Sequence, residues 1–565
     1  MTQPFEYKAA ALNDSINEEL NAWQKENKVK LLWAGDASLW TNSDENQWVG
    51  WLTIAGKELN EVSHIEALAD ELKVKGYENI LVLGMGGSSL CPAMLAETFG
   101  KVGNFPRLHV LDSTDPMQIH HLEEALDLTK TFFIVSSKSG STLEPNIFKQ
   151  YFYTRLQTLL GKVEVSEHFL AITDPGTTLD TMAKEEQFKA IFHGEPSIGG
   201  RYSALSNFGM LPAGLMGIPV KNFLGFAEKM AESCSPAILP KDNPGVLLGA
   251  ILGISAKQGK DKVTLITSPG IKALGAWLEQ LLAESTGKNG KGLIPIDNEP
   301  LGPPDVYGND RIFIYIRLED APNAEQDAAV AALEQARQVV VRLKLPSKDQ
   351  LAAELFRWEI ATAVAGSIIG INPFNQPDVE GNKQLAAKLI DEYTKNPLSQ
   401  HREGSSIPLR TQGSSQKELT AHLNRIQLND YVNFSAFIEM NDAHSKLLQK
   451  SRVLIRNAKK VATCVGFGPR FLHSTGQDYK GGPNTGVFIQ ITADHPEDIQ
   501  IPGYDYSFGL VIDAQAEADF ETLRARGRRV MRVHLGNDIE RGLQHLNKMI
   551  EEILSVKNGE NHGSK

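Results

Sequence analysis

Cysteine is scarce in this chain, with Cys91, Cys234 and Cys464 far apart among 565 residues. Three scattered cysteines form neither a disulfide framework nor a cluster of metal ligands, and they favour a reducing compartment. No run of about 18 apolar residues occurs, so no segment is long enough to cross a membrane as a helix. The first residues also lack a basic stretch followed by an apolar one, as a secretory signal would have. We therefore expect a cytoplasmic protein without a membrane partner.

Positive charge is also in deficit, since the formal net charge is -12. An acidic chain argues against a nucleic-acid partner, and the basic run at 524–529 is more typical of a solvated surface. Hydrophobic residues make up 41% and charged residues 22%, which is ordinary for a globular protein. The length of 565 residues predicts two to four domains.

The most informative stretch is 79–92. Its four apolar residues at 80–83 predict a strand buried on both faces, as in a parallel sheet. Gly84, Gly86, Gly87 and Ser88 follow, and then an apolar run at helical spacing. A glycine turn that opens a helix directs backbone N–H groups at one point, which suits a phosphate.

Two better-known phosphate motifs fit less well. The Walker motif needs a Gly-Lys-Ser/Thr sequence, which is absent. The dinucleotide fingerprint needs a third glycine where Ser89 stands, although Asp112 after the next strand keeps that interpretation open. A tight turn without any ligand is the simpler alternative.

Further βα units follow, with strands expected at 108–111, 131–135 and 169–173. The repeat predicts a right-handed, doubly wound parallel sheet that binds ligands at the carboxyl ends of its strands. The turn after the 131–135 strand gathers polar side chains, namely Ser137, Lys138, Ser139, Ser141 and Thr142. Hydroxyls at a helix start suit a phosphomonoester, although any one of them could serve only as a helix cap.

Two later segments carry charged candidates. Gly199 and Gly200 precede Arg201, whose guanidinium could meet developing negative charge or could tie a loop. A helix beginning near 277 and ending at Gly287 carries Gln280 and Glu284, four residues apart and therefore on one side. The helix dipole disfavours Glu284 at that end, so it is a candidate functional residue, with a surface glutamate as the alternative.

Five motifs in this order resemble those of the phosphoglucose isomerase family, within the group of sugar-isomerase (SIS) domains. They lie at 84–90, 137–144, 198–203, 280–288 and 375–385. The tract 466–483 further resembles the isomerase half of bifunctional transaldolase–phosphoglucose isomerases. The resemblance implies an α/β fold with two SIS domains at 65–220 and 221–397, a helical segment at 1–64 and a C-terminal α/β domain at 419–556.

The same resemblance implies the roles of individual residues. Glu284 would be the base, Arg201 would stabilise an enediolate, Gln280 would lie against the substrate and Lys383 near the ring oxygen. The phosphate would bind to Gly87, Ser88, Ser137, Ser139 and Thr142, with Lys138 nearby. No cofactor and no metal are implied, and the family would form a homodimer around a sugar-phosphate substrate.

One family feature is missing. The ring-opening histidine normally lies between the base and the final lysine, but no histidine occurs between Glu284 and Lys383. A sequence similar to the family's histidine motif occurs after Lys383 instead, and it has Asp478 at the position of that histidine. We favour His473 as the ring-opening acid. The alternatives are Lys480, a different route of ring opening, and a His473 that is only a core or loop residue.

We therefore expect a glucose-6-phosphate isomerase. Its rivals are an isomerase that also accepts mannose 6-phosphate, a non-catalytic sugar-phosphate-binding protein and, more remotely, a dinucleotide oxidoreductase. In the C-terminal part, strands are expected at 430–438, 461–465, 487–492 and 508–512, and a polar loop at 398–418.

Overall fold

Three parallel sheets organise the chain in the computed structural model, which describes residues 5–162, 164–395, 407–408 and 412–560. The first sheet has the order β3-β2-β4-β5-β6 and consists of β2 (Asn79–Gly84), β3 (Arg107–Leu111), β4 (Thr131–Ser136), β5 (Phe169–Thr173) and β6 (Ala190–His193). The predicted α/β class and the strands at 80–83, 108–111, 131–135 and 169–173 are confirmed.

The second sheet has the order β1-β10-β9-β7-β8, with β7 (Lys262–Thr267), β8 (Ile294–Ile296), β9 (Arg311–Leu318) and β10 (Val339–Leu345). The N-terminal strand β1 (Glu6–Lys8) pairs with β10 and is the one antiparallel member among the described strands. Residues 1–64, expected to be helical, therefore also complete this sheet. Their helices are α1 (Asn13–Lys25), α2 (Lys28–Ala34) and α3 (Ile54–Glu58).

The third sheet has the order β11-β15-β14-β12-β13, with β11 (Ile407–Pro408), β12 (Tyr431–Phe437), β13 (Ala462–Phe467), β14 (Gly486–Thr492) and β15 (Arg529–His534). Across this sheet the strands that follow β11 lie in the order β13-β12-β14-β15. The orders β3-β2-β4-β5 and β8-β7-β9-β10 in the other two sheets are equivalent. All three sheets thus share one doubly wound core topology.

The predicted strand at 508–512 is wrong. These residues begin helix α19 (Phe508–Ala525), whose N-terminus is capped by the side chain of Ser507. The apolar run there is the buried face of a helix, and short apolar runs do not distinguish a helix from a strand. The strand β15 lies instead at 529–534, where arginines alternate with apolar residues. The expected loop at 398–418 lies largely outside the described residues, and from residue 412 the chain forms α16 (Gln412–Leu423).

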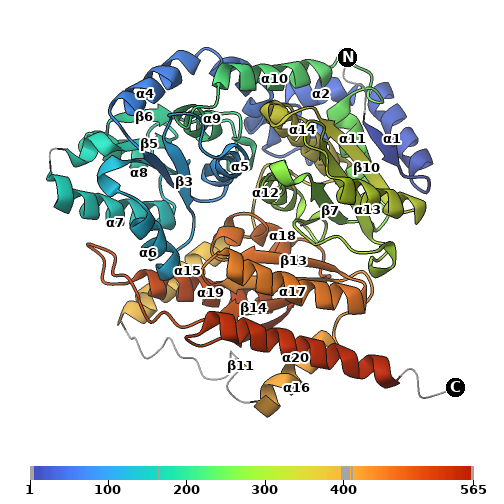
Figure 1. Ribbon diagram of the computed structural model, residues 1–565. Helices are drawn as coiled ribbons and strands as arrows, with labels where there is room; N and C mark the ends of the chain where they lie inside the picture. The colour runs from blue at the N-terminus through green and yellow to red at the C-terminus, as the bar shows by residue number, and fades with distance from the viewer. Residues whose placement is uncertain (1–4, 163, 396–406, 409–411, 561–565) are drawn as a thin grey trace.

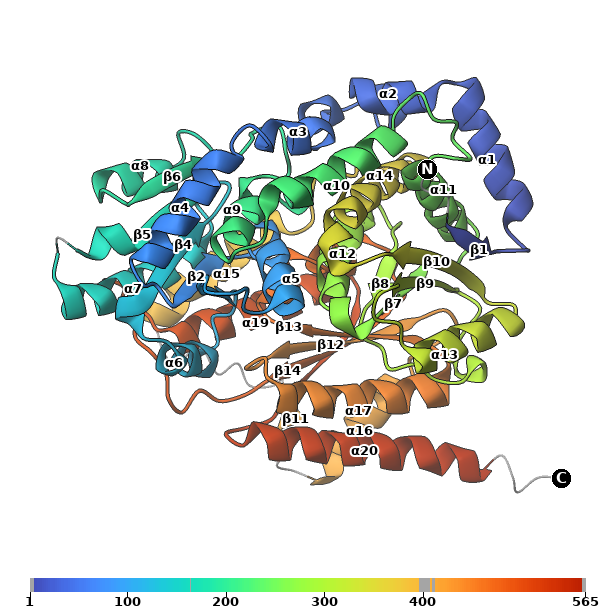
Figure 2. The ribbon, with the colours of Figure 1, turned by 45° about the horizontal axis from the view of Figure 1, so that its top comes forward.

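Figure 1 shows the first sheet and its helices at the upper left, the second at the upper right and the C-terminal unit below both. The helices of the first part are α4 (Val62–Val74), α5 (Leu90–Phe99), α6 (Pro116–Ala125), α7 (Leu143–Leu160), α8 (Thr178–Glu185) and α9 (Asn207–Leu215). Those of the second are α10 (Val220–Ser233), α11 (Pro244–Lys257), α12 (Leu274–Thr286), α13 (Ala324–Gln335) and α14 (Leu351–Ile369). Those of the C-terminal unit are α17 (Asp442–Lys459), α18 (Gly476–Gly481), α19 and α20 (Ile539–Glu560), with α17 and α20 on the far side of its sheet (Figure 2).

Helix α15 (Glu380–Lys395), which carries Lys383, joins the first part to the C-terminal unit. Its residues Leu389 and Ile390 share a buried apolar cluster with Phe148 of α7 and with Phe508 and Val511 of α19. The contact puts the start of α15 at the junction of the first sheet and the C-terminal unit. The domain boundaries expected at 64, 220, 397 and 419 stay predictions.

Candidate active site

Two glycine turns approach each other at the carboxyl end of the first sheet. Gly86 has a φ of +56°, and a Cβ placed there would lie 2.8 Å from the His473 carbonyl oxygen. A Cβ on Gly87 would lie only 2.1 Å from the Gly200 carbonyl oxygen. Glycine is therefore required at both positions for the backbones to meet. This close approach brings the turn after β2 beside Arg201.

Arg201 is buried and held by four acceptors. Its Nε donates to Ser285 Oγ at 2.8 Å, and Nη2 donates to the carbonyl oxygens of Pro373 and Asn375, each at 2.8 Å. Nη1 donates to Gln376 Oε1 at 3.1 Å. A guanidinium fixed in this way is pre-organised to meet negative charge without moving.

The Glu284 carboxylate lies directly against this guanidinium, with Oε1 3.3 Å from Arg201 Nη1. Gln280, one helical turn earlier on α12, donates from Nε2 to Glu284 Oε2 at 3.0 Å, so both side chains lie on one face as predicted. The Glu284 side chain is 15% exposed, which is low for a glutamate at a helix end. The Gln280 Oε1 atom is buried and has no partner among the described residues.

His473 arrives from the C-terminal unit, in the short 3-10 turn Arg470–His473. Its Nε2 lies 3.0 Å from Glu144 Oε1, and its carbonyl oxygen accepts from Gln280 Nε2 at 2.9 Å. Gln515 of α19 also donates to Glu144 Oε1, at 2.7 Å. Burial alone would raise the pKa of the Glu144 carboxyl, but the charge and hydrogen bond of His473 outweigh it and hold that pKa below its usual value. The contact with Glu144 holds the His473 imidazole in one orientation.

The hydroxyl turn after β4 lies at the start of α7. Ser137 Oγ donates to Thr142 Oγ1 at 3.3 Å, and Thr142 occupies the N-cap of α7 without a side-chain cap bond. The Ser139 hydroxyl is exposed and accepts only from its neighbour Ser141. Ser88, at the other turn, is largely buried. These hydroxyls stand at the carboxyl ends of β2 and β4, the neighbouring strands where the strand order reverses.

Lys138 points away from this turn. Its ammonium pairs with Asp174 and donates to the carbonyl oxygens of Glu195 and Pro196, each at 3.4 Å. The ammonium is therefore occupied in tying loops together. Lys138 was expected near the phosphate, but its side chain binds Asp174 and two loop carbonyl oxygens instead.

A cavity of about 1000 Å³ adjoins the cluster. The predicted residues that line it are Ser139, Thr142, Lys383 and His473, together with Glu144, Gln376 and Gln515. Lys383 is 53% exposed and lies 3.8 Å from Glu380. Glu284, Arg201 and Gln280 lie next to this space rather than on its lining. Arg201 donates to Gln376, and Gln280 donates to the His473 carbonyl oxygen.

Two alternative residues prove to be engaged elsewhere. Lys480, the second candidate for ring opening, is buried and donates to Asp519 Oδ1 at 2.6 Å. Asp112, which kept a dinucleotide site in question, is buried, accepts from Ser89 Oγ at 3.2 Å and lies 3.4 Å from Arg470 Nε. It is therefore not open to a ribose. Among the described residues, no group of three or more His, Cys, Asp or Glu side chains is arranged to hold a metal ion.

Sequence reasoning missed Glu144, Gln376 and Gln515 as members of the cluster. Glu144 could have been found, because it is an acidic residue at a helix start within a motif that had already been singled out. Gln515 lies in a helix that had been taken for a strand, and nothing in its local sequence marks it.

The comparisons with known proteins agree on one family. The family model described as phosphoglucose isomerase matches residues 69–295. A probable glucose-6-phosphate isomerase of Methanococcus maripaludis is 29% identical over 381 residues, covering 59% of this chain and 85% of the relative. A glucose-6-phosphate isomerase of Trichormus variabilis is 29% identical over 419 residues, covering 63% of this chain and 77% of the relative.

Solved structures support the fold. A hypothetical protein of Thermus thermophilus superposes with a TM-score of 0.60 at 24% identity, covering 68% of this chain and 99% of its own. A glucose-6-phosphate isomerase of Chlamydia trachomatis superposes with a TM-score of 0.56 at 21% identity, covering 67% of this chain and 86% of its own. The likeness to bifunctional transaldolase enzymes is not tested by these relatives and stays a prediction. In the described part of the chain, no helix is both long and apolar enough to cross a membrane.

Proposed function

Because this chain belongs to the phosphoglucose isomerase family, we propose that it interconverts glucose 6-phosphate and fructose 6-phosphate by proton transfer through an enediolate. The observation that carries the proposal is the placement of Glu284 against Arg201, at 3.3 Å, with Gln280 donating both to the carboxylate and to the carbonyl oxygen of His473. A candidate base thus lies against a fixed positive charge, and Gln280 links this pair to the segment that carries the candidate acid. Binding alone would need only the hydroxyl turns.

Glu284 is proposed to move the proton between C2 and C1 of the open-chain sugar. A hydrogen next to a carbonyl is weakly acidic, so removing it requires both a positioned base and stabilisation of the oxygen that becomes negative. Arg201 supplies that charge, and Gln280 holds Glu284 in place. A general base contributes about 10²–10⁴-fold to such a rate.

His473 is proposed to open the sugar ring by giving a proton to the ring oxygen. Glu144 would hold the imidazole by the 3.0 Å contact with Nε2, which leaves Nδ1 for the proton transfer. The alternative, Lys480, is supported less, since its ammonium is engaged by Asp519. Lys383, exposed on the same cavity, would assist at the ring oxygen.

Thr142, Ser137, Ser139, Ser88 and the backbone of Gly87 are proposed to bind the phosphate. Thr142 supports this role best, because its hydroxyl is at a helix N-cap and makes no cap bond. Phosphate bound at a distance from the reacting carbons supplies orientation, which lowers the barrier without taking part in the chemistry. We keep Lys138 in this set only through its backbone, since its ammonium is paired with Asp174.

The test is turnover of fructose 6-phosphate by the purified chain, followed through a dehydrogenase specific for glucose 6-phosphate, with EDTA present. We expect an enzyme-like rate that EDTA leaves unchanged. Absence of turnover, together with protection against thermal unfolding by a sugar phosphate, would contradict the proposal and favour the binding protein. Mannose 6-phosphate serves as the second substrate, and its interconversion at a comparable rate would show the broader specificity.

A further inference from the structure

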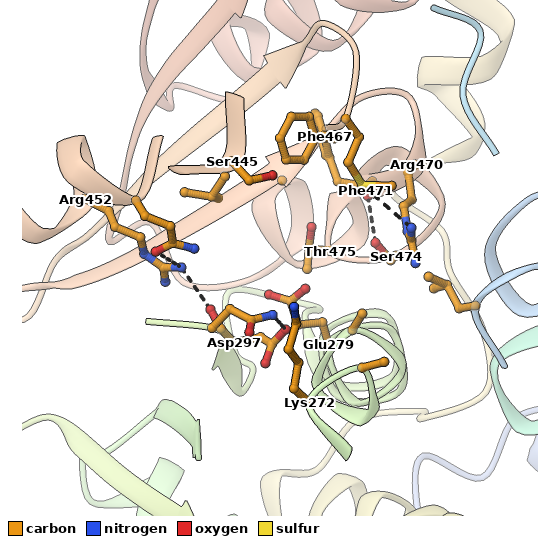
Figure 3. Close-up of a pocket in the computed structure, with 18 of the residues that line it drawn as sticks. Lys272, Glu279, Asp297, Ser445, Arg452, Phe467, Arg470, Phe471, Ser474 and Thr475 are labelled. Atoms are coloured by element: carbon orange, nitrogen blue, oxygen red, sulfur yellow. Dashed lines mark hydrogen bonds between the residues drawn. The ribbon is translucent and has the colours of Figure 1, made fainter. Parts of the chain in front are cut away.

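A second cavity of about 660 Å³ lies between the second sheet's helix α12 and the C-terminal unit. Figure 3 shows its two walls: Lys272, Glu279 and Asp297 on one, and Ser445, Arg452, Phe467, Phe471 and Thr475 on the other. Asp297 follows β8, and the opposite wall is built from segments that follow β12 and β13. Ligands of parallel α/β sheets bind in such crevices, outside the carboxyl ends of the strands.

The floor of this cavity carries a pair of carboxyl groups. Burial and the nearby Asp297 carboxylate raise the pKa of Glu279 well above its usual value, and burial likewise raises the pKa of Asp297. A carboxyl group accepts hydrogen bonds when ionised and also donates one when protonated. Hydroxyl groups, which also donate and accept, are their natural partners.

One further polar group in the cavity lacks a partner among the described residues. Thr475 is 3% exposed, and its Oγ1 atom has no hydrogen-bond partner among the described residues. A buried hydroxyl without a partner is costly, and a ligand hydroxyl would remove that cost. Phe467, which is half-buried on the same wall, offers an aromatic face to the apolar part of a ligand.

Positive charge lies at the exposed side of the cavity. Lys272 is 60% exposed and lies 3.4 Å from Glu97, and Lys446 of α17 is exposed on the opposite wall. Two ammonium groups, one from each wall, can hold a phosphate from both sides as point charges. The cavity therefore combines hydroxyl partners in its depth with cations at its opening.

We propose that this cavity is a second binding site, for a small phosphorylated polyol or sugar. The carboxyl pair and Thr475 would take the hydroxyls, and Lys272 and Lys446 would take the phosphate. The volume of about 660 Å³ lies within the range of small-molecule sites, which suits a hexitol phosphate.

The cavity shares two structural elements with the proposed catalytic cluster. Ser474 and Thr475, which line it, follow His473 directly, and Glu279 precedes Gln280 on α12. Gln280 Nε2 in turn donates to the His473 carbonyl oxygen at 2.9 Å. Occupancy would therefore shift the position of His473 and change turnover. This coupling rests on the proposed function, whereas the binding site itself does not.

Calorimetric titration with sorbitol 6-phosphate, which can neither close a ring nor isomerise, tests the site. Ser445 lies on the wall formed by α17, and Ser445→Trp would fill the cavity. Ala443→Trp is the matched control, because Ala443 is exposed on the same helix and does not line the cavity. We expect Ser445→Trp to remove one binding site per chain relative to the unaltered protein, and Ala443→Trp to remove none.

An equal number of sites in Ser445→Trp and the unaltered protein would overturn the proposal. If sorbitol 6-phosphate did not bind at the proposed catalytic site, the unaltered protein would bind one molecule per chain, and Ser445→Trp would bind none. Failure of the proposed function can therefore be distinguished from failure of the second site. Should Ser445→Trp not fold, Lys446→Glu is the second variant, since this lysine is exposed. It should weaken one class of sites by about fivefold, because a charge at the phosphate is reversed, and unchanged affinity would count against the site.

Turnover at saturating fructose 6-phosphate tests the coupling, because competition at the catalytic site is then overcome. Sorbitol 6-phosphate should change kcat by at least twofold in the unaltered protein and in Ala443→Trp, and should not change it in Ser445→Trp. An unchanged kcat in the unaltered protein would refute the coupling.

Discussion

Replacement of Glu144 by glutamine tests whether His473 depends on a charged partner. Glu144 is 4% exposed, and its Oε1 lies 3.0 Å from His473 Nε2. Glutamine keeps the shape and an acceptor oxygen but removes the negative charge beside the imidazole. A hydrogen bond to a charged group contributes about 1.5–3 kcal/mol to stability, which corresponds to about a 10- to 100-fold change in an equilibrium or a rate.

The assay separates ring opening from proton transfer between carbons. Exchange of the two anomers of glucose 6-phosphate requires ring opening but no proton abstraction at C2, and NMR exchange spectroscopy measures it. We expect Glu144→Gln to slow anomer exchange and isomerisation together, by about 10- to 100-fold. Glu164→Gln, an exposed control between α7 and β5, should change neither. Unchanged anomer exchange in Glu144→Gln would refute the role of the Glu144–His473 pair.

Three further predictions follow from the same structure. Thr142→Val should raise KM about tenfold or more, because a hydroxyl bonded to a charged phosphate is lost. Its Tm should stay nearly unchanged, because Thr142 makes no cap bond. An unchanged KM would place the phosphate elsewhere. Because burial raises the pKa of Glu58 to about 7, its contribution to stability is fully present below pH about 4.5 and is lost as pH rises through 7, by about 3 kcal/mol. Glu58→Gln should therefore remove part of the loss of stability to urea between pH 5 and 8, and an equal loss in both proteins would contradict this. Arg201 contacts Glu284, and Gln280 links Glu284 to the His473 carbonyl oxygen, all within one chain. Specific activity should therefore not fall when the protein is diluted to monomers, as followed by light scattering. Loss of activity on dissociation would mean that a partner chain completes the site.

The strands of the first sheet could be predicted because each is a continuous apolar run followed by a glycine or hydroxyl turn. That pattern is typical of parallel strands covered on both faces. The segment 508–512 failed because an apolar run of this length also fits a buried helix face. The strand at 529–534 was missed because Arg529 and Arg532 stand where an apolar residue would have signalled it. In the fold, Arg532 Nη1 donates to Glu517 Oε2 at 2.5 Å, a partner that is invisible locally.

The candidate site, like the fold, could be predicted from the sequence only in part. Gln280 and Glu284 could be placed on one helix face from spacing alone, since four residues make about one turn. The preference for His473 over Lys480 could not be supported from local sequence, because the partners of both lie far along the chain. His473 meets Glu144, which is 329 residues away, and Lys480 meets Asp519. These contacts depend on the packing of the C-terminal unit, which the sequence does not show.

The most direct test of the account compares the unaltered protein with Glu284→Gln. Turnover of fructose 6-phosphate and the Kd for a sugar phosphate would be measured on both. We expect Glu284→Gln to lose about 10²–10⁴-fold in kcat, because the base is gone, with a Kd within threefold of the unaltered value, because the phosphate contacts remain. Turnover of Glu284→Gln within tenfold of the unaltered protein would contradict the assignment of Glu284 as the base, and with it the mechanism proposed for this site.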